Sequence, residues 1–183
     1  YNALVIIDEV QSGVGRTGTF FAYEQFDIIP DILCFAKGMA NGFPIGGILT
    51  SNKISDSMTA GSHGTTFGGG PIACAIGSRV VDIISKKAFL TKVLRKEKRL
   101  IKKLNEINSS YQCFNEISSA GLWISVELAG MDVDDLIKLS HKNGLMVLKA
   151  NATTIRFSPS LIIEDLLIDN GLEIFERSIL QLQ

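Results

Sequence analysis

Lys37 stands in a setting that could make its amine reactive. It follows the mostly apolar run 32–36 and precedes Gly38, and the glycine-rich stretch "NGFPIGG" comes next. Removal from water favours the neutral form of a lysine, and a neutral amine can attack a carbonyl to form a covalent bond. The small neighbours leave room for a bulky, flat group. A lysine at a strand end is commonly an ordinary surface residue, but this setting favours one that carries a cofactor.

Asp8 is a second candidate, at the end of the apolar run 3–8. Such a run is typical of a strand in a parallel sheet that is covered on both faces. Open α/β sheets bind their ligands at the carboxyl ends of the strands, although a single aspartate there often only caps a turn. Asp8 and Lys37 together suit pyridoxal phosphate, because a carboxylate can keep the pyridine nitrogen protonated while a lysine binds the aldehyde.

Two glycine-rich segments could bind phosphate. "GVGRTG", at 13–18, matches the dinucleotide-binding pattern G-x-G-x-x-G and follows a strand, but that pattern must open a helix. The aromatic segment "TFFAYEQFDIIPD" follows instead, so we expect a glycine-rich turn there and no bound dinucleotide. The later loop "GSHGTTFGG", at 61–69, offers hydroxyl and backbone N–H groups that suit a phosphate.

The composition argues against several other functions. A net charge of −1 and the lack of a basic patch interleaved with aromatic residues argue against nucleic-acid binding. The cysteines at 34, 74 and 113 are far apart and odd in number, so we expect buried, reduced thiols and a cytoplasmic protein. Only two histidines are present, so no metal site is expected. No run is long enough to span a membrane, and no signal peptide opens the chain.

The hydrophobic pattern predicts two regions of different texture. The first has strands at 3–8, 32–36 and 47–51, a helix that begins at Pro71, and an amphipathic helix over 89–107. We expect the basic segment 92–103 to form a solvated helix face. The second region alternates shorter elements: the strands "GLWISVEL", "LMVLKA" and "TIRFSP", a helix from Asp132 to Gly144, and a last helix opened by acidic residues. We therefore expect part of an α/β domain followed by a smaller α+β domain. Because a strand begins almost at Tyr1 with no methionine before it, we expect a piece of a longer protein.

Four segments carry a family resemblance: "LVIIDEVQSGVGRTGTFFAYE", "PDILCFAKGMANGFPIGG", "HGTTFGGGP" and "IRFSPSLII". In their order and spacing they resemble the class III pyridoxal-phosphate aminotransferases, most closely the acetylornithine group. The resemblance covers nearly the whole chain and corresponds to the C-terminal half of that family's subunit. It implies a fold-type I α/β architecture, with 1–98 as the second half of the large, mainly parallel-sheet domain and 99–183 as the small domain.

The resemblance also implies roles for individual residues. Asp8 matches the aspartate that pairs with the pyridine nitrogen, and Lys37 matches the lysine that binds the cofactor. The other matches are Val10, packed on the cofactor ring; Gln11, near its phenolic oxygen; Thr66, at the cofactor phosphate of the neighbouring subunit; and Arg156, which holds the substrate α-carboxylate. The implied enzyme is a cytoplasmic homodimer with shared sites that moves an amino group from N-acetylornithine to 2-oxoglutarate in arginine or lysine biosynthesis.

Two departures from the family pattern leave alternatives open. Gly70 stands where the family usually has asparagine, which we expect to loosen the start of the next helix. The family's first half, with its phosphate loop and ring-stacking aromatic, has no counterpart here. Close alternatives are the ornithine, succinylornithine, succinyldiaminopimelate and 4-aminobutyrate aminotransferases. A different alternative is a truncated, non-catalytic module that only dimerises or binds a partner.

Overall fold

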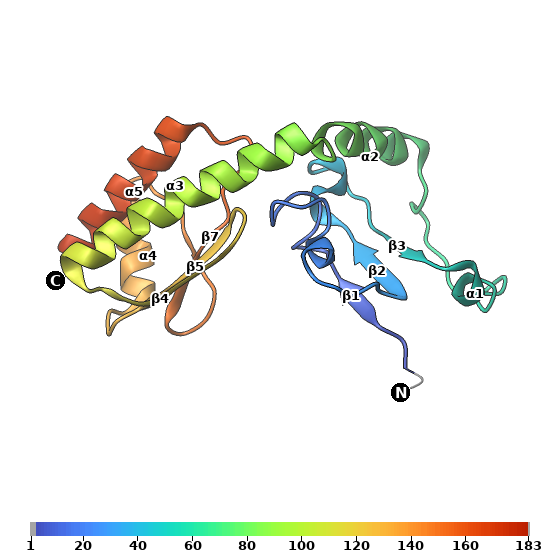
Figure 1. Ribbon diagram of the computed structural model, residues 1–183, viewed down its shortest axis with the longest axis horizontal. Helices are drawn as coiled ribbons and strands as arrows, with labels where there is room; N and C mark the ends of the chain where they lie inside the picture. Colours follow the sequence, from blue (N-terminus) through green and yellow to red (C-terminus); the bar gives the residue numbers. More distant parts are fainter. Residues whose placement is uncertain (1–2, 183) are drawn as a thin grey trace. The chain divides into compact units, whose positions relative to one another are not determined.

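The computed structural model describes residues 3–182, which form two compact units (Figure 1). The first ends at Leu90 and the second begins at Thr91. The division falls inside the helix α3 (Lys87–Tyr111), which contributes most of its length to the second unit. Strands and helices occur in both units, which confirms the predicted α/β class.

The first unit is built on a three-stranded sheet with the order β1-β2-β3. Its strands are β1 (Ile6–Asp8), β2 (Ile32–Phe35) and β3 (Gly47–Thr50). β1 and β2 run parallel, whereas β3 runs antiparallel to β2, so the sheet in this chain is mixed. β1 is shorter than the predicted strand 3–8, and before it the backbone N–H of Val5 donates to the side chain of Asp31.

The predicted turn at 13–18 is confirmed, because hydrogen-bonded turns and no helix occur at these residues. The remaining elements of this unit are two short 3₁₀-helices, η1 (Ala22–Gln25) and η2 (Lys37–Ala40), and two α-helices, α1 (Asn52–Ser55) and α2 (Pro71–Ile84). The turn, the N-cap of η1, β2, η2 and α2 share one core, which contains Val14, Phe21, Leu33, Met39 and Val80. The core therefore fixes the loops after β1 and β2 to the sheet.

α2 begins at Pro71, as predicted, and only some of its apolar residues are buried. Ala73 and Val80 are buried, whereas Ile72 is 66% exposed and Ile83 is also exposed. Gly70 is the N-cap residue and provides no side-chain hydrogen bond. The helix start therefore lacks the side-chain acceptor that an asparagine would supply.

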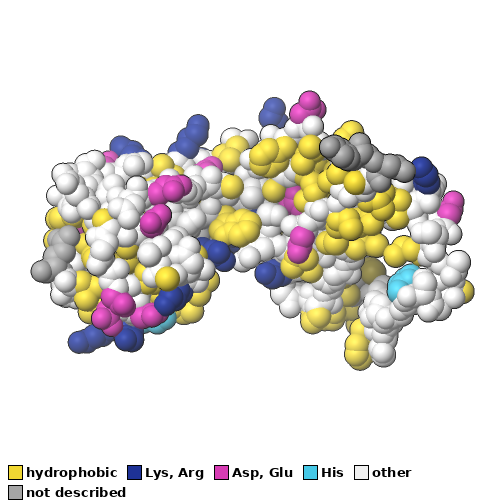
Figure 2. Space-filling model, turned by 90° about the horizontal axis from the view of Figure 1, so that it is seen from below, with side chains coloured by type: hydrophobic (Ala, Val, Ile, Leu, Met, Phe, Trp, Pro, Cys, Tyr) yellow, Lys and Arg dark blue, Asp and Glu magenta, His cyan; other side chains and the backbone are white. Residues whose placement is uncertain are grey.

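The sheet of the first unit is not covered on both faces within this chain, although its strands are apolar. Leu4, Ile6, Ile48 and Leu49 belong to or adjoin its strands, and all four are exposed. Hydrophobic side chains also gather on the face of this unit seen in Figure 2. Apolar strands of this kind normally lie beneath other elements.

The second unit contains a four-stranded antiparallel sheet with the order β4-β5-β7-β6. Its strands are β4 (Phe114–Ala120), β5 (Trp123–Leu128), β6 (Leu148–Lys149) and β7 (Thr154–Phe157). Three of the strands were predicted, but β4 was missed because its sequence, "FNEISSA", is largely polar. Along β5 the buried Ile124, Val126 and Leu128 alternate with partly exposed residues, as expected for a strand with one face in a core.

Helices α3, α4 (Val133–Lys142) and α5 (Asp165–Leu180) complete the second unit. The ring of Phe175 on α5 packs edge-on against Phe157 of β7, with ring centroids 5.0 Å apart. The predicted cap of α4 is confirmed, because Asp132 Oδ1 accepts a hydrogen bond of 2.9 Å from the Asp135 N–H. No helix within residues 3–182 is long and apolar enough to cross a membrane.

The basic segment 92–103 is not simply a solvated face. Lys96 is only 8% exposed, and its Nζ donates a 2.9 Å hydrogen bond to the carbonyl of Leu161. Burial lowers the pKa of Lys96. Arg95 and Arg99 pair with Asp165 and Asp169 on α5, so this face of α3 lies against α5, where Figure 1 also draws the two helices side by side.

Candidate active site

Asp8 and Lys37 lie at the same edge of the sheet in the first unit, where β1 and β2 end. Asp8 is the last residue of β1 and lies in register with Cys34 of β2. The Glu9 N–H continues this pairing with a 2.9 Å hydrogen bond to the Cys34 carbonyl. Because β1 and β2 are parallel, the carboxyl end of each strand, and the residue that follows it, reach this edge. The pairing confirms that two chemically useful side chains come from adjacent strand ends, where α/β sheets bind ligands.

The carboxylate of Asp8 is exposed, and only one of its oxygens accepts a hydrogen bond from the described part of the chain. Its Oδ1 accepts a 2.9 Å hydrogen bond from the backbone N–H of Val10. No other hydrogen bond or ion pair from residues 3–182 reaches it. The turn that this bond closes carries the half-buried Val10 and the exposed Gln11. The arrangement presents a carboxylate oxygen, an apolar side chain and an amide next to one another.

Lys37 has an unusual backbone conformation, with φ of +42°. This left-handed region is rare for residues other than glycine, costs about 1–3 kcal/mol and is found disproportionately at functional sites. A Cβ placed on Gly38 would lie 3.4 Å from Cβ of Val14, so the turn after β1 packs directly against the lysine loop. The expectation that Lys37 is removed from water is wrong for this chain, in which the side chain is exposed.

Glu9 is a residue that the sequence reasoning missed. Its side chain is 1% exposed and accepts hydrogen bonds from Ser12 Oγ at 2.8 Å and from the backbone N–H groups of Ala22 and Tyr23 at 2.9 and 2.7 Å. A Cβ on Gly13 would lie 2.9 Å from the Glu9 carbonyl oxygen, too close for a side chain. Glu9 therefore ties the turn that carries Asp8, Val10 and Gln11 to η1. The apolar residues on both sides of the "DE" pair were the only sequence signal for this burial.

Arg156 lies in the second unit, in the middle of β7. Its guanidinium carbon is 5.5 Å from the centroid of the Trp123 ring. Its Nε is buried without a hydrogen-bond partner, and no carboxylate among residues 3–182 forms an ion pair with it. A guanidinium without a protein anion is suited to bind a carboxylate ligand.

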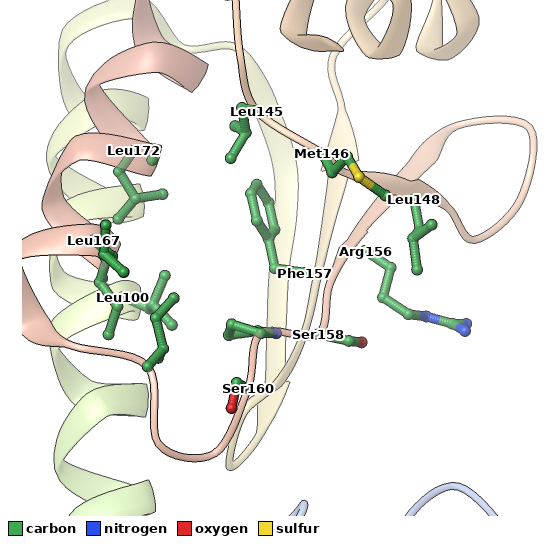
Figure 3. Close-up of a pocket in the computed structure, with 14 residues that line it drawn as sticks. Leu100, Leu145, Met146, Leu148, Arg156, Phe157, Ser158, Ser160, Leu167 and Leu172 are labelled. Carbon is green, nitrogen blue, oxygen red and sulfur yellow. The ribbon is translucent and has the colours of Figure 1, made fainter. Parts of the chain in front are cut away.

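An apolar pocket of 370 Å³ lies beside Arg156 (Figure 3). The guanidinium points away from Leu100, Leu167, Leu172 and Phe157, whereas Leu148 lies beside the Arg156 side chain. The lining residues include Leu100, Leu145, Phe157, Leu167 and Leu172. The charged end of Arg156 is therefore directed elsewhere than into the pocket.

Thr66 is not brought to the other predicted site residues by any contact in the first unit. It is exposed in the glycine-rich loop before α2, and no hydrogen bond within residues 3–182 joins it to Asp8 or Lys37. The first unit thus places Asp8, Val10, Gln11 and Lys37 at the carboxyl ends of two adjacent parallel strands.

The expectation that all three cysteines are buried is wrong, since Cys74 is exposed, although all three are free thiols.

The donor set at this sheet edge fits pyridoxal phosphate. A free carboxylate oxygen of Asp8 suits a protonated ring nitrogen, the exposed amine of Lys37 suits an aldehyde, and Val10 offers apolar contact for a ring. Small residues flank the lysine loop: a Cβ on Gly46 would come within 3.3 Å of Ala36 Cβ. A larger residue at position 46 would therefore crowd Ala36, the residue directly before Lys37.

Known proteins with similar sequences and structures support this interpretation. The family model "Aminotransferase class-III" matches residues 1–179. Acetylornithine aminotransferase of Pseudomonas putida is 40% identical over 98% of this chain and 45% of its own length. An acetylornithine/succinyldiaminopimelate aminotransferase of Photorhabdus laumondii is 44% identical over 100% of this chain and 46% of its own length.

A solved structure shows the same fold. The crystal structure of N-acetylornithine aminotransferase from Stenotrophomonas maltophilia matches with a TM-score of 0.88 and 31% identity, over 98% of this chain and 48% of that one. The likeness confirms the predicted fold-type I architecture for the part of the fold that this chain covers. The chain spans about half the length of the relatives it matches. Its sequence and fold place it in the class III aminotransferases, the family to which it belongs.

Proposed function

We propose that this chain forms part of a pyridoxal-phosphate transaminase that moves an amino group from N-acetylornithine to 2-oxoglutarate. The observation that carries the proposal is the placement of Asp8 and Lys37 at the ends of adjacent parallel strands, with neither side chain held by an ion pair from the described residues 3–182. The relatives named for acetylornithine support this amino donor. The name of the relative from Photorhabdus laumondii keeps succinyldiaminopimelate as a second candidate donor.

Each candidate site residue of this chain would have its own role in the reaction. Bound pyridoxal phosphate supplies a carbonyl and an electron sink. The Asp8 carboxylate would hold the proton on the ring nitrogen, Val10 would pack on one face of the ring, and Gln11 would lie near its phenolic oxygen. The Lys37 amine would hold the aldehyde group and would also move a proton at the δ-carbon of the donor. Arg156 would bind the α-carboxylate of the substrate, which is the role that the family resemblance gives it.

The working enzyme would be a cytoplasmic homodimer with sites shared across its interface. Thr66 is exposed and has no hydrogen bond to Asp8 or Lys37, so it is available to bind the cofactor phosphate of a neighbouring subunit. Residues 1–98 would belong to the large domain and residues 99–183 to the small domain. The free cysteines agree with a reducing compartment.

The function is tested with a full-length subunit, meaning this chain joined to the part of the relatives' length that it does not span. Glutamate formation from 2-oxoglutarate is measured with N-acetylornithine, succinyldiaminopimelate, ornithine and 4-aminobutyrate as donors. We expect the highest kcat/KM for N-acetylornithine. No glutamate from any of these donors would contradict the proposed activity and favour a non-catalytic module.

Replacing Arg156 with lysine is expected to weaken substrates that carry an α-carboxylate. A guanidinium can make two parallel bonds to a carboxylate, whereas an ammonium cannot, and we expect a loss of about 1.5–3 kcal/mol in binding. The KM for N-acetylornithine and for a simple amine such as n-butylamine is measured in the parent and in Arg156→Lys. Equal losses for both substrates would indicate a structural role for Arg156.

Mixed dimers test whether Thr66 acts across the interface. Full-length Lys37→Ala and full-length Thr66→Val are each expected to be impaired, and they are combined into heterodimers. One of the two sites then has an intact Lys37 and receives an intact Thr66 from its partner, so about half of the normal activity should return. If Thr66 serves its own chain, every site retains one defect and mixing restores nothing.

A further inference from the structure

We propose that Trp123 is a positioning residue that aims the guanidinium of Arg156 at the substrate carboxylate. The inference rests on the carboxylate-binding role proposed for Arg156. It adds a residue from a different strand, and it makes the affinity for carboxylate substrates depend on an aromatic ring that does not itself contact the substrate.

The register of the sheet brings the two side chains together. β5 and β7 are antiparallel, and Arg156 lies opposite Ser125. Trp123 precedes Ser125 by two residues, so it lies on the same face of the sheet as a diagonal neighbour of Arg156, within reach of a long side chain. The 5.5 Å separation between the guanidinium carbon and the ring centroid is within the range of a cation–π contact.

The other neighbours on this face leave the charge of Arg156 uncompensated. The residue opposite Arg156 on β6 is Leu148, and the residue opposite on β5 is Ser125. Glu127 lies opposite Thr154 and forms no ion pair with Arg156. Trp123 is therefore the side chain that orients the guanidinium without neutralising it.

This distinction has a chemical consequence. A carboxylate partner would hold Arg156 in place but would compete with the substrate for its N–H groups. An indole ring attracts the cation through its face and takes none of the N–H donors in the guanidinium plane. The ring thus lowers the conformational freedom that Arg156 must lose when a carboxylate binds, which favours binding.

The test compares Trp123→Leu and Trp123→Phe in the full-length subunit, with Leu148→Ala as the matched control. Leu148 is also next to Arg156 but has no aromatic face. For Trp123→Leu we expect the KM for N-acetylornithine and 2-oxoglutarate to rise about three- to tenfold, with a much smaller change for n-butylamine. Trp123→Phe should recover most of this loss, because it restores an aromatic face. Leu148→Ala should not discriminate between carboxylate substrates and the amine.

A spectroscopic measurement accompanies the kinetics. Trp123 is the single tryptophan of this chain, so the difference between the fluorescence of the parent and of Trp123→Phe isolates its emission. Removal of the cation in Arg156→Met should change this emission. An emission that is the same with and without the guanidinium would show that the two groups are not in contact and would overturn the inference.

The outcomes separate this inference from the proposed function. If Arg156→Lys selectively weakens carboxylate substrates while Trp123→Leu affects carboxylate substrates and n-butylamine equally, or neither, the role of Trp123 is wrong and that of Arg156 stands. If Leu148→Ala reproduces the selective loss, any gap beside Arg156 is sufficient and the role of the ring is wrong. If Arg156→Lys itself shows no selectivity, the proposed carboxylate site fails, and the inference fails with it.

Discussion

Replacing Lys37 with alanine in the full-length subunit is expected to abolish the visible absorption of the lysine-bound cofactor and to lower turnover by several orders of magnitude. Lys37 follows β2 with a left-handed backbone, next to Gly38 and close to the turn that carries Asp8. Alanine has no side-chain amine, so it can neither bind an aldehyde covalently nor transfer a proton at the substrate carbon. Absorption spectra and glutamate formation measure the two losses.

Lys53→Ala is the matched control for this experiment. Lys53 is an exposed lysine of the same unit, in α1, which follows β3 at the opposite end of the sheet from the carboxyl ends of β1 and β2. We expect its removal to leave absorption and turnover close to those of the parent. Borohydride reduction followed by peptide mapping identifies the lysine that carries the cofactor. A cofactor trapped on another lysine, or absorption that persists in Lys37→Ala, would show that the assignment is wrong.

Asp8→Asn is expected to leave the cofactor bound and to lower turnover by at least about 100-fold. The amide has the same shape and can still accept the hydrogen bond from Val10, which in the parent is 2.9 Å long. The local turn should therefore persist. An amide cannot hold a protonated ring nitrogen as a carboxylate does, so the electron sink is weakened. Turnover and bound cofactor are measured on the same preparation.

Asp31→Asn controls for the loss of a negative charge from this unit. Asp31 precedes β2, and its carboxylate accepts a hydrogen bond from Val5, before β1. Both residues belong to the amino ends of their strands, opposite the candidate site. We expect nearly normal turnover in Asp31→Asn. Turnover in Asp8→Asn that equals the parent value would rule out the role given to Asp8.

The two strands that carry the candidate site could be found from the sequence, and the third element of the sheet could not be oriented. Continuous apolar runs predicted β1 and β2, and their ends located Asp8 and Lys37. The antiparallel direction of β3 depends on how the loop 36–46 returns the chain to the sheet, which local pattern does not encode. β4 was missed because a strand with a polar composition has no clear apolar alternation.

Sequence patterns also could not decide which polar residues are buried. Glu9 and Lys96 look like exposed charged residues when they are read along the chain. The fold surrounds the first with three donors and places the second against the carbonyl of Leu161. Burial of a charged group is acceptable only where such partners converge, and that convergence involves segments up to 65 residues apart.

The sequence by itself determined the α/β class, the family, and the residue types available for chemistry, because apolar runs and motif spacing are local properties of the chain. Only the tertiary structure decided that the Lys37 side chain is exposed in this chain, that Glu9 anchors the turn after β1, and that the ring of Trp123 meets the guanidinium of Arg156. The physical reason is that each of these facts depends on strand register or on packing between distant segments. A shift of one residue in the pairing of β5 with β7 would move Trp123 and Arg156 to opposite faces of the sheet.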